Sequence, residues 1–163
     1  MRGSISYSEQ LQMIVRRYRE TDQPWPATTR QIAGWGLANN LWAPQHDKII
    51  TQFADDLARA MREEYITDDQ GRTVRSKHAA RVVRDGEQLV LWADIRSAPR
   101  EHMELALQQR RHQIVGDCRQ LKSDADSYNE NGNSGKPINL VFDFRDDLAE
   151  LETMESLRNP TRV

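Results

Sequence analysis

The sequence of 163 residues has almost no cysteine and no long apolar segment. Cys118 is the only cysteine, which excludes a disulfide within this chain and a cysteine-rich zinc site. No apolar run approaches the ~18 residues that a membrane-spanning helix needs. The opening residues, MRGSISYSEQ, contain no apolar core of a secretion signal. We therefore expect a cytoplasmic protein in a reducing compartment, without a membrane partner.

The sequence also lacks the motifs of the common catalytic sites. It contains neither a glycine-rich phosphate-binding loop nor a nucleophile elbow. Its four histidines are His46, His78, His102 and His112. No two of them have the four-residue spacing that places two imidazoles on one metal from one helix. We therefore expect no enzyme activity, no cofactor and no metal site, with a metal-dependent nuclease as a remote alternative.

Apolar periodicity and helix caps predict three helices followed by a hairpin. Two pairs of residues, Ser6 with Glu9 and Thr28 with Gln31, have the spacing of capping boxes. A longer apolar stripe follows the helix that Thr28 and Gln31 cap, and it predicts the third helix. Turn sequences, DDQG and RDGEQ, then bracket a candidate hairpin, although residues 77–80 could equally form a helical turn. The predicted helices cover residues 7–20, 29–39 and 45–65, and the predicted strands cover 73–83 and 89–95.

The second half of the chain begins with a long predicted helix at 98–128. Apolar residues recur every seven positions along it, which is typical of a short coiled-coil seam. The residues of this seam are Leu107, Ile114, Leu121 and Tyr128. The seam predicts a homodimer, although packing against the chain's own domain is an open alternative. Beyond it, 138–144 alternates as a strand with one apolar face, and an acidic amphipathic helix follows.

The order of elements resembles that of winged helix-turn-helix DNA-binding domains. TTRQIAGWGLANN corresponds to the first helix of the helix-turn-helix pair, PQHDKIITQFADDLARA to the recognition helix and RVVRDGEQLVLWADI to the wing. The resemblance implies an α+β, mostly helical fold. Its expected parts are a winged-helix-like domain at 6–96, a long dimerising helix at 97–128, and a loop, strand and acidic helix at 129–163.

The resemblance also implies that the start of the third helix enters a major groove of DNA. Amide and ammonium groups there have the chemistry to pair with base edges. The residues placed near bases are Gln45, His46, Lys48, Thr51 and Gln52.

One stretch, GRTVRSKHAARVVR at residues 71–84, is strongly basic although the formal net charge is −2. It has five cations and no acidic residue: Arg72, Arg75, Lys77, Arg81 and Arg84. A basic strand that leads into a wing would lie along the phosphate backbone. A solvated strand face, or a bed for the acidic C-terminal segment of the same chain or its partner, is an equal alternative.

The four tryptophans are expected to serve mainly in packing. Trp35, Trp42 and Trp92 lie within or beside apolar elements, whereas Trp25 lies between two prolines and is expected to be exposed. No aromatic residues interleave with the basic stretch in the way that single-strand stacking requires.

These observations together predict a regulatory protein that binds double-stranded DNA as a homodimer. A non-enzymatic protein-interaction module on the same scaffold is the rival, because the net charge is slightly negative. The acidic C-terminal segment offers a surface for a protein partner. Alternatively, it covers the basic stretch when no DNA is bound.

Overall fold

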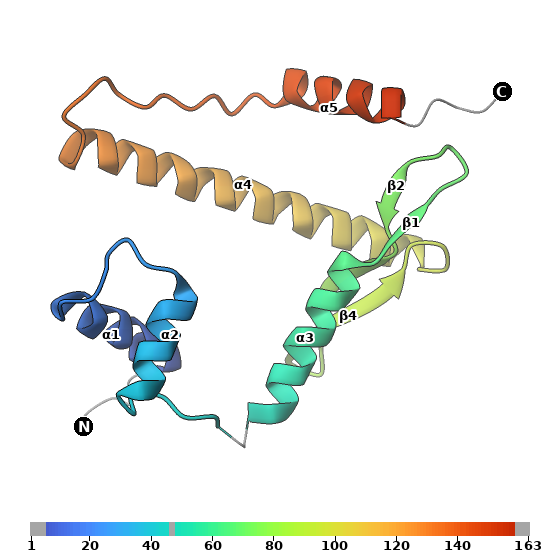
Figure 1. Ribbon diagram of the computed structural model, residues 1–163. Coiled ribbons are helices and arrows are strands. Elements are labelled where there is room, and N and C mark those ends of the chain that lie inside the picture. Colours follow the sequence, from blue (N-terminus) through green and yellow to red (C-terminus); the bar gives the residue numbers. More distant parts are fainter. Residues whose placement is uncertain (1–5, 46–47, 159–163) are drawn as a thin grey trace. The chain divides into compact units, whose positions relative to one another are not determined.

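The computed structural model describes residues 6–45 and 48–158 and confirms the predicted α+β class (Figure 1). The chain divides into two compact units, Met1–Phe53 and Ala54–Val163. The helices in the described residues are α1 (Tyr7–Glu20), α2 (Thr29–Ala38), α3 (Ile49–Glu63), α4 (Arg100–Asn131) and α5 (Arg145–Arg158). The strands there are β1 (Tyr65–Thr67), β2 (Thr73–Arg75), β3 (Lys77–Arg84) and β4 (Glu87–Asp94).

Both predicted capping boxes form in the first unit. The Ser6 hydroxyl accepts a hydrogen bond from the Glu9 N–H (3.2 Å), and the Glu9 carboxylate accepts one from the Ser6 N–H (2.7 Å). Thr28 and Gln31 repeat the arrangement at the start of α2 (3.2 and 2.8 Å). The hydrogen bond from the Ser6 backbone lowers the pKa of Glu9, so the cap is fully ionised at neutral pH. Local sequence therefore determines where both helices begin.

Tyr18 is the packing centre of the first unit. Its side chain is 2% exposed, and its hydroxyl donates to the Pro24 carbonyl (3.2 Å). The Trp35 ring lies edge-on to the Tyr18 ring, with 5.5 Å between centroids. Gly36 permits the close approach of α2 to α1, because a Cβ at this position would lie 3.3 Å from Cγ2 of Ile14. Trp35 is thus a packing residue, as expected, and Trp25 is half exposed.

The third helix is shorter than predicted at both ends. It begins at Ile49 rather than at 45 and ends at Glu63, because Tyr65 enters strand β1. Its apolar stripe is exposed, with Ile50 at 83% and Phe53 at 63% exposure. Burial of an apolar face is the usual source of helix stability in a protein. Since much of this stripe is exposed and only Ala58 and Met61 of it are partly buried among the described residues, winged-helix packing stays a prediction.

The basic stretch forms two strands, and the prediction of a single strand at 73–83 is wrong. Ser76 separates them and is buried at 3% exposure. Its N–H donates to the Glu64 carbonyl (2.9 Å), and its own carbonyl accepts from the Ile95 N–H (2.8 Å). Strand β2 consequently pairs with β1, whereas β3 pairs with β4. The sequence did not predict strand β1, because its three residues directly follow a helix whose predicted end lies at residue 65.

The β3–β4 hairpin closes through the tight turn predicted from RDGEQ. Asp85 and Gly86 are its two central residues, and both have positive φ, at 51° and 81°. This combination belongs to the type I′ turn, whose twist matches that of the paired strands. The hairpin is therefore also specified locally.

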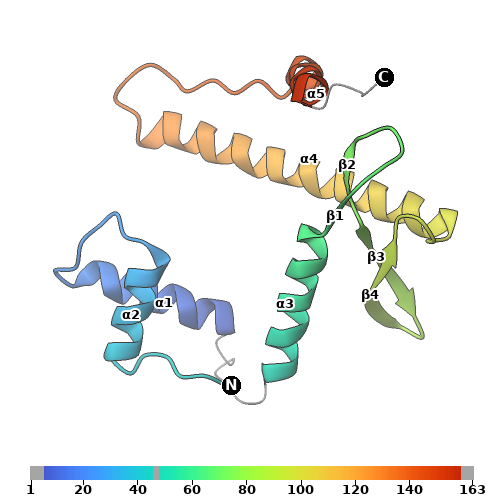
Figure 2. The same ribbon diagram turned by 45° about the vertical axis from the view of Figure 1, so that its right-hand side comes forward.

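Helix α4 packs along β3 (Figure 2). Ala80 of β3 is fully buried, and Ala106 of α4 is 3% exposed. The side-chain amide of Gln109 accepts from the Arg81 N–H (2.7 Å) and donates to the Arg81 carbonyl (2.8 Å). His102 lies 2.9 Å from the His78 carbonyl through Nε2. The Gln109 amide thus satisfies the main-chain groups of Arg81, which point away from β4 in the strand register, while His102 adds a contact to the His78 carbonyl.

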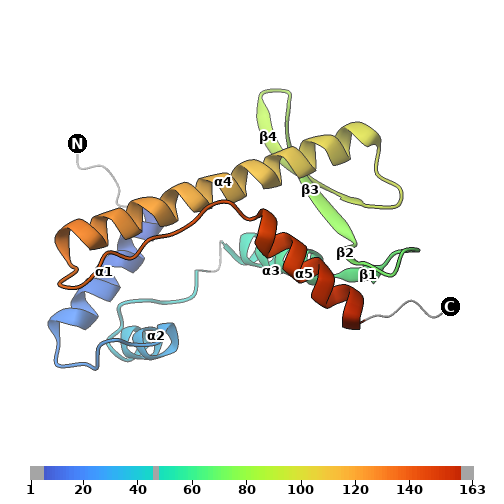
Figure 3. The ribbon, with the colours of Figure 1, turned by 90° about the horizontal axis from the view of Figure 1, so that it is seen from above.

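Beyond α4 the chain turns and runs extended to α5 (Figure 3). The side chain of Asn129 bonds the N–H (2.9 Å) and the carbonyl (2.8 Å) of Ile138, which fixes the start of this segment beside α4. The predicted strand at 138–144 is wrong, since a strand needs a neighbouring strand for its hydrogen bonds and the described residues supply none. The acidic helix is present as α5, with its apolar residues exposed.

The role of Tyr18 predicts two distinct stability losses in the first unit. Replacing Tyr18 with Ala should cost about 3–5 kcal/mol because it leaves a cavity. Replacing Tyr18 with Phe should cost only about 1 kcal/mol, because one hydrogen bond is lost while the packing is kept. Native-state hydrogen exchange of the α1 and α2 amides measures both. Equal, small losses would show that Tyr18 does not organise this unit.

Candidate nucleic-acid interface

A hollow of about 790 Å³ lies within the second unit, between α4, the β3–β4 hairpin and the end of α3. No carboxylate is among its lining residues. We call it the basic hollow after the five cations that line it: Arg62, Arg75, Lys77, Arg81 and Arg110.

Strand alternation and helix docking bring these cations together. Lys77, Ala79 and Arg81 alternate along β3 and share one face of the hairpin. In the strand register Ala79 lies opposite Trp92 and Arg81 opposite Val90. Arg110 directly follows the glutamine that bonds the Arg81 main chain. The hollow therefore depends on tertiary packing that residues 71–84 do not encode.

Nearby carboxylates neutralise part of the basic stretch. Lys77 Nζ lies 2.8 Å from Glu64 and 3.7 Å from Asp94. The hydrogen bond to Glu64 raises the pKa of Lys77. Arg72 is paired in the same way, with its Nε 2.7 Å from the Asp68 carboxylate. These two cations are thus engaged by acids that lie outside residues 71–84.

The remaining guanidinium groups of the hollow have no acidic partner. Within the described residues, the side chains of Arg75, Arg81 and Arg110 form neither an ion pair nor a hydrogen bond. Arg62 lies over the ring of Trp92, 5.3 Å from its centroid. Arg84 is outside the lining, opposite Glu87 in the strand register. Three arginines are therefore available to an anion.

The pKa of His78 reflects partial burial and the positive charges that line the hollow. Partial burial lowers the pKa of this histidine below 6.5, and the charges of Arg110 and Arg75 lower it further. A hydrogen bond to the Arg75 carbonyl (3.2 Å) opposes these effects without cancelling them. The lowered pKa thus favours the uncharged imidazole in this surrounding of arginines.

The residues predicted to contact bases belong to the first unit, whereas the residues that line the basic hollow belong to the second. Gln45 is exposed in the segment that precedes α3, and His46 falls outside the described residues. Lys48 Nζ lies 4.2 Å from the ring centroid of Tyr7. Thr51 and Gln52 are exposed on the first turns of α3. Their contact with bases stays a prediction.

The residues predicted to form a dimer are all accessible along α4. Leu107, Ile114, Leu121 and Tyr128 have exposures between 50% and 52%. The acidic residues of α5 are exposed as well, and within the described part of the chain none of them pairs with a cation of the basic stretch. The counter-charges of that stretch come instead from acids that precede or follow it.

Sequence reasoning missed three members of the site: Arg62, Arg110 and Trp92. Arg62 lies on the preceding helix and Arg110 on a helix 26 residues beyond Arg84, so neither belongs to the basic stretch and no local pattern connects them with it. The alternation of β4 did place Trp92 on a strand, but core packing was expected for it. In the structure it lines the basic hollow and is only partly buried.

Comparison with known proteins gives no relative: no family model, no curated protein and no solved structure matches this chain. Within the described residues, no three His, Cys, Asp or Glu side chains come together as a metal site would require. No helix in the same part of the chain combines the length and apolar character needed to cross a bilayer.

The lowered pKa of His78 predicts a pH dependence of stability. The unfolded chain binds a proton near pH 6.5, whereas folded His78 binds it only at lower pH. The contribution of His78 to the free energy of unfolding is therefore fully present above pH 6.5. It declines as the pH falls from 6.5 to the pKa of His78 in the folded chain. Denaturant unfolding across this range, with His78→Gln as the comparison, measures the effect. An equally steep decline in the variant would exclude His78 as its source.

Proposed function

We propose that the protein binds nucleic acid, with double-stranded DNA as the expected ligand, through the basic hollow. The observation that supports this function is the convergence of Arg75, Arg81 and Arg110, none of which has a carboxylate partner in the part of the chain that the structure describes. A cluster of unpaired guanidinium groups favours phosphate, because each can donate two parallel hydrogen bonds to phosphate oxygens. Release of condensed counterions adds to the affinity.

The proposed role is regulatory, and the proposed active form is a homodimer. Helix α4 contains 32 residues, and its contacts with β3 involve residues near its N-terminal half. The apolar side chains farther along it are half exposed. Two copies that pair along this part of α4 would bury them and present two basic hollows to one duplex.

A protein-interaction module is the second candidate function. It is favoured by apolar side chains that the described chain leaves uncovered: Ile50 and Phe53 of α3, and Leu151 and Leu157 of α5, at 62–83% exposure. The acidic residues of α5 would suit a basic partner. This candidate replaces the first if a folded sample fails to bind duplex DNA at low salt.

Removing the three unpaired guanidinium groups should weaken DNA binding. The combined variant Arg75→Ala, Arg81→Ala and Arg110→Ala should lose at least about tenfold in affinity for duplex DNA at low salt, because charge-assisted hydrogen bonds are lost. The slope of log affinity against log salt should decrease by roughly 0.9 for each phosphate contact removed. Fluorescence anisotropy over a salt series measures both quantities.

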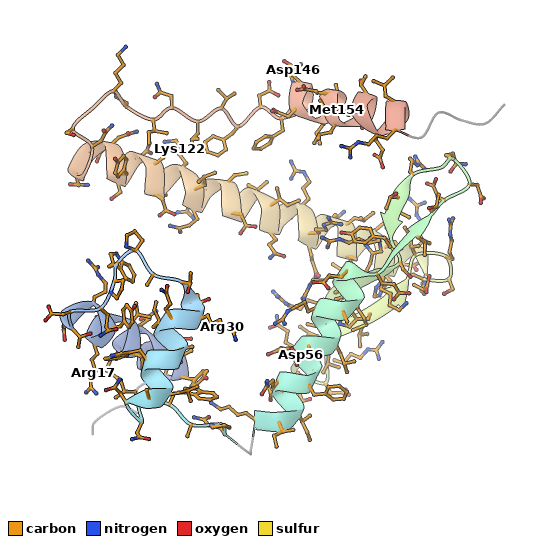
Figure 4. All side chains as sticks on the ribbon, viewed as in Figure 1. Arg17, Arg30, Asp56, Lys122, Asp146 and Met154 are labelled. Atoms are coloured by element: carbon orange, nitrogen blue, oxygen red, sulfur yellow. The ribbon has the colours of Figure 1, made fainter. Side chains whose placement is uncertain are left out.

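A charge-matched variant provides the control. Arg119→Ala, Lys122→Ala and Arg158→Ala remove the same charge from the second half of α4, where Lys122 lies, and from the end of α5 (Figure 4). This variant should keep nearly the affinity and salt slope of the original chain. Equal losses in the two variants would mean that only net charge matters, and the hollow would then not be the binding site.

The proposed dimer predicts dissociation when charge enters the seam. Replacing Ile114 and Leu121 with Glu should convert the dimer to a monomer, because two carboxylates would be buried in the interface. Helix content should persist, since both side chains are about half exposed in the single chain. Light scattering gives the mass and circular dichroism the helix content, with Ser127→Glu, off the seam, as the control. A monomer in the original chain at all concentrations would refute the dimer.

A further inference from the structure

The wall of the basic hollow contains an accessible indole. Trp92 of β4 is only partly buried, although it lies in an apolar strand. Its cross-strand neighbour is Ala79, whose methyl group covers little of the ring. The indole N–H forms no hydrogen bond with any residue in the described part of the chain. One aromatic face is therefore held beside cations rather than in a core.

The position of Arg62 marks the ring face that a ligand can reach. Its guanidinium carbon lies 5.3 Å from the centroid of Trp92, and the Arg62 side chain is exposed. A planar cation over an indole shows that the face has room for a flat group. A nucleobase is also flat and stacks on aromatic rings whatever its sequence. Because Arg62 has no carboxylate partner among residues 6–45 and 48–158, it can leave the ring without breaking an ion pair there.

We propose that the basic hollow binds one unpaired nucleotide, with the phosphate at Arg75, Arg81 and Arg110 and the base on Trp92. This inference rests on the proposed nucleic-acid function and narrows the ligand of the hollow from a paired duplex to an unpaired nucleotide, in a single strand or extruded from a duplex. A base within a duplex is stacked between its neighbours, so only an unpaired or extruded nucleotide can present its face to the indole. The volume of about 790 Å³ lies in the range of small-ligand sites.

The remaining lining supplies hydrogen-bonding groups for a base edge. Gln108 and Gln113 face the hollow from α4, and His112 does so with Nδ1 bonded to the Gln108 carbonyl (3.1 Å), which leaves Nε2 for a ligand. Amide side chains offer both donors and acceptors, which suit the mixed edges of nucleobases. Gln109 is not in this set, because its amide is occupied by the Arg81 main chain. The hollow thus combines phosphate-binding, stacking and edge-reading groups at one place.

The experiment compares a short thymidine oligonucleotide with an abasic oligonucleotide of equal length. The original chain should bind the thymidine oligonucleotide more tightly. Trp92→Ala should weaken that binding by about five- to hundredfold, the range expected for one stacked base, and should leave abasic binding nearly unchanged. Trp92→Phe should retain most of the preference, because phenylalanine keeps an aromatic face. Fluorescence anisotropy of the labelled strands measures each affinity.

A second variant separates stacking from folding. Trp92→Leu keeps an apolar side chain in β4, and circular dichroism establishes whether the hairpin and α4 remain folded. A folded Trp92→Leu protein that retains the full preference for thymidine over abasic strands would overturn the inference. Abasic binding that still depends on Arg75 and Arg81 would leave the proposed nucleic-acid function intact. If the original chain binds no oligonucleotide even at low salt, both the nucleotide site and the proposed nucleic-acid function are refuted.

Competition identifies the source of the nucleotide. Thymidine monophosphate that displaces the oligonucleotide far better than inorganic phosphate supports a site for free nucleotides. Displacement only by a longer strand supports a site for a nucleotide within a strand. In the Trp92→Ala variant, thymidine monophosphate should compete no better than inorganic phosphate, and a thymidine strand should compete no better than an abasic strand. The proposal would be overturned if inorganic phosphate and thymidine monophosphate competed equally and thymidine and abasic strands bound equally well.

Discussion

The second unit depends on how α4 is attached to strand β3. The amide of Gln109 bonds the N–H and the carbonyl of Arg81, as a neighbouring strand would, and the small side chains of Ala80 and Ala106 permit close approach. This attachment satisfies part of the strand edge that β4 leaves unpaired. It also places Arg110 beside the cations of the hairpin. One side-chain amide therefore contributes both to the fold and to the site.

The elements that local chemistry specifies could be predicted from the sequence. Capping boxes gave the starts of α1 and α2, and the Asp-Gly turn gave the β3–β4 hairpin. Two errors arose where distant partners decide the outcome. Ser76 divides the basic stretch because its main chain bonds Glu64 and Ile95 rather than continuing one ladder. Residues 138–144 have the alternation of a strand, but alternation specifies a face and not a partner.

The candidate site could be predicted only in part for the same reason. The sequence locates Arg75 and Arg81 in a basic stretch, but the absence of acids within that stretch does not show which cations are unpaired. Lys77 is paired through Glu64 and Asp94, which lie on other segments. Trp92 resembles a core residue in sequence because neighbouring apolar residues surround it. Its exposure follows from the small residue opposite and from the position of α4.

The uneven charge along α4 has a consequence for how a ligand would approach. The half of the helix that packs on the hairpin has three arginines against two glutamates, whereas the C-terminal half has four acidic residues against Arg119 and Lys122, and the helix dipole is also negative at that end. A polyanion outside contact distance would thus exert a torque that turns the hairpin end toward it. At low ionic strength this alignment would favour productive encounters despite the small negative net charge, whereas at about 0.1 M salt the field would be largely screened beyond about 10 Å.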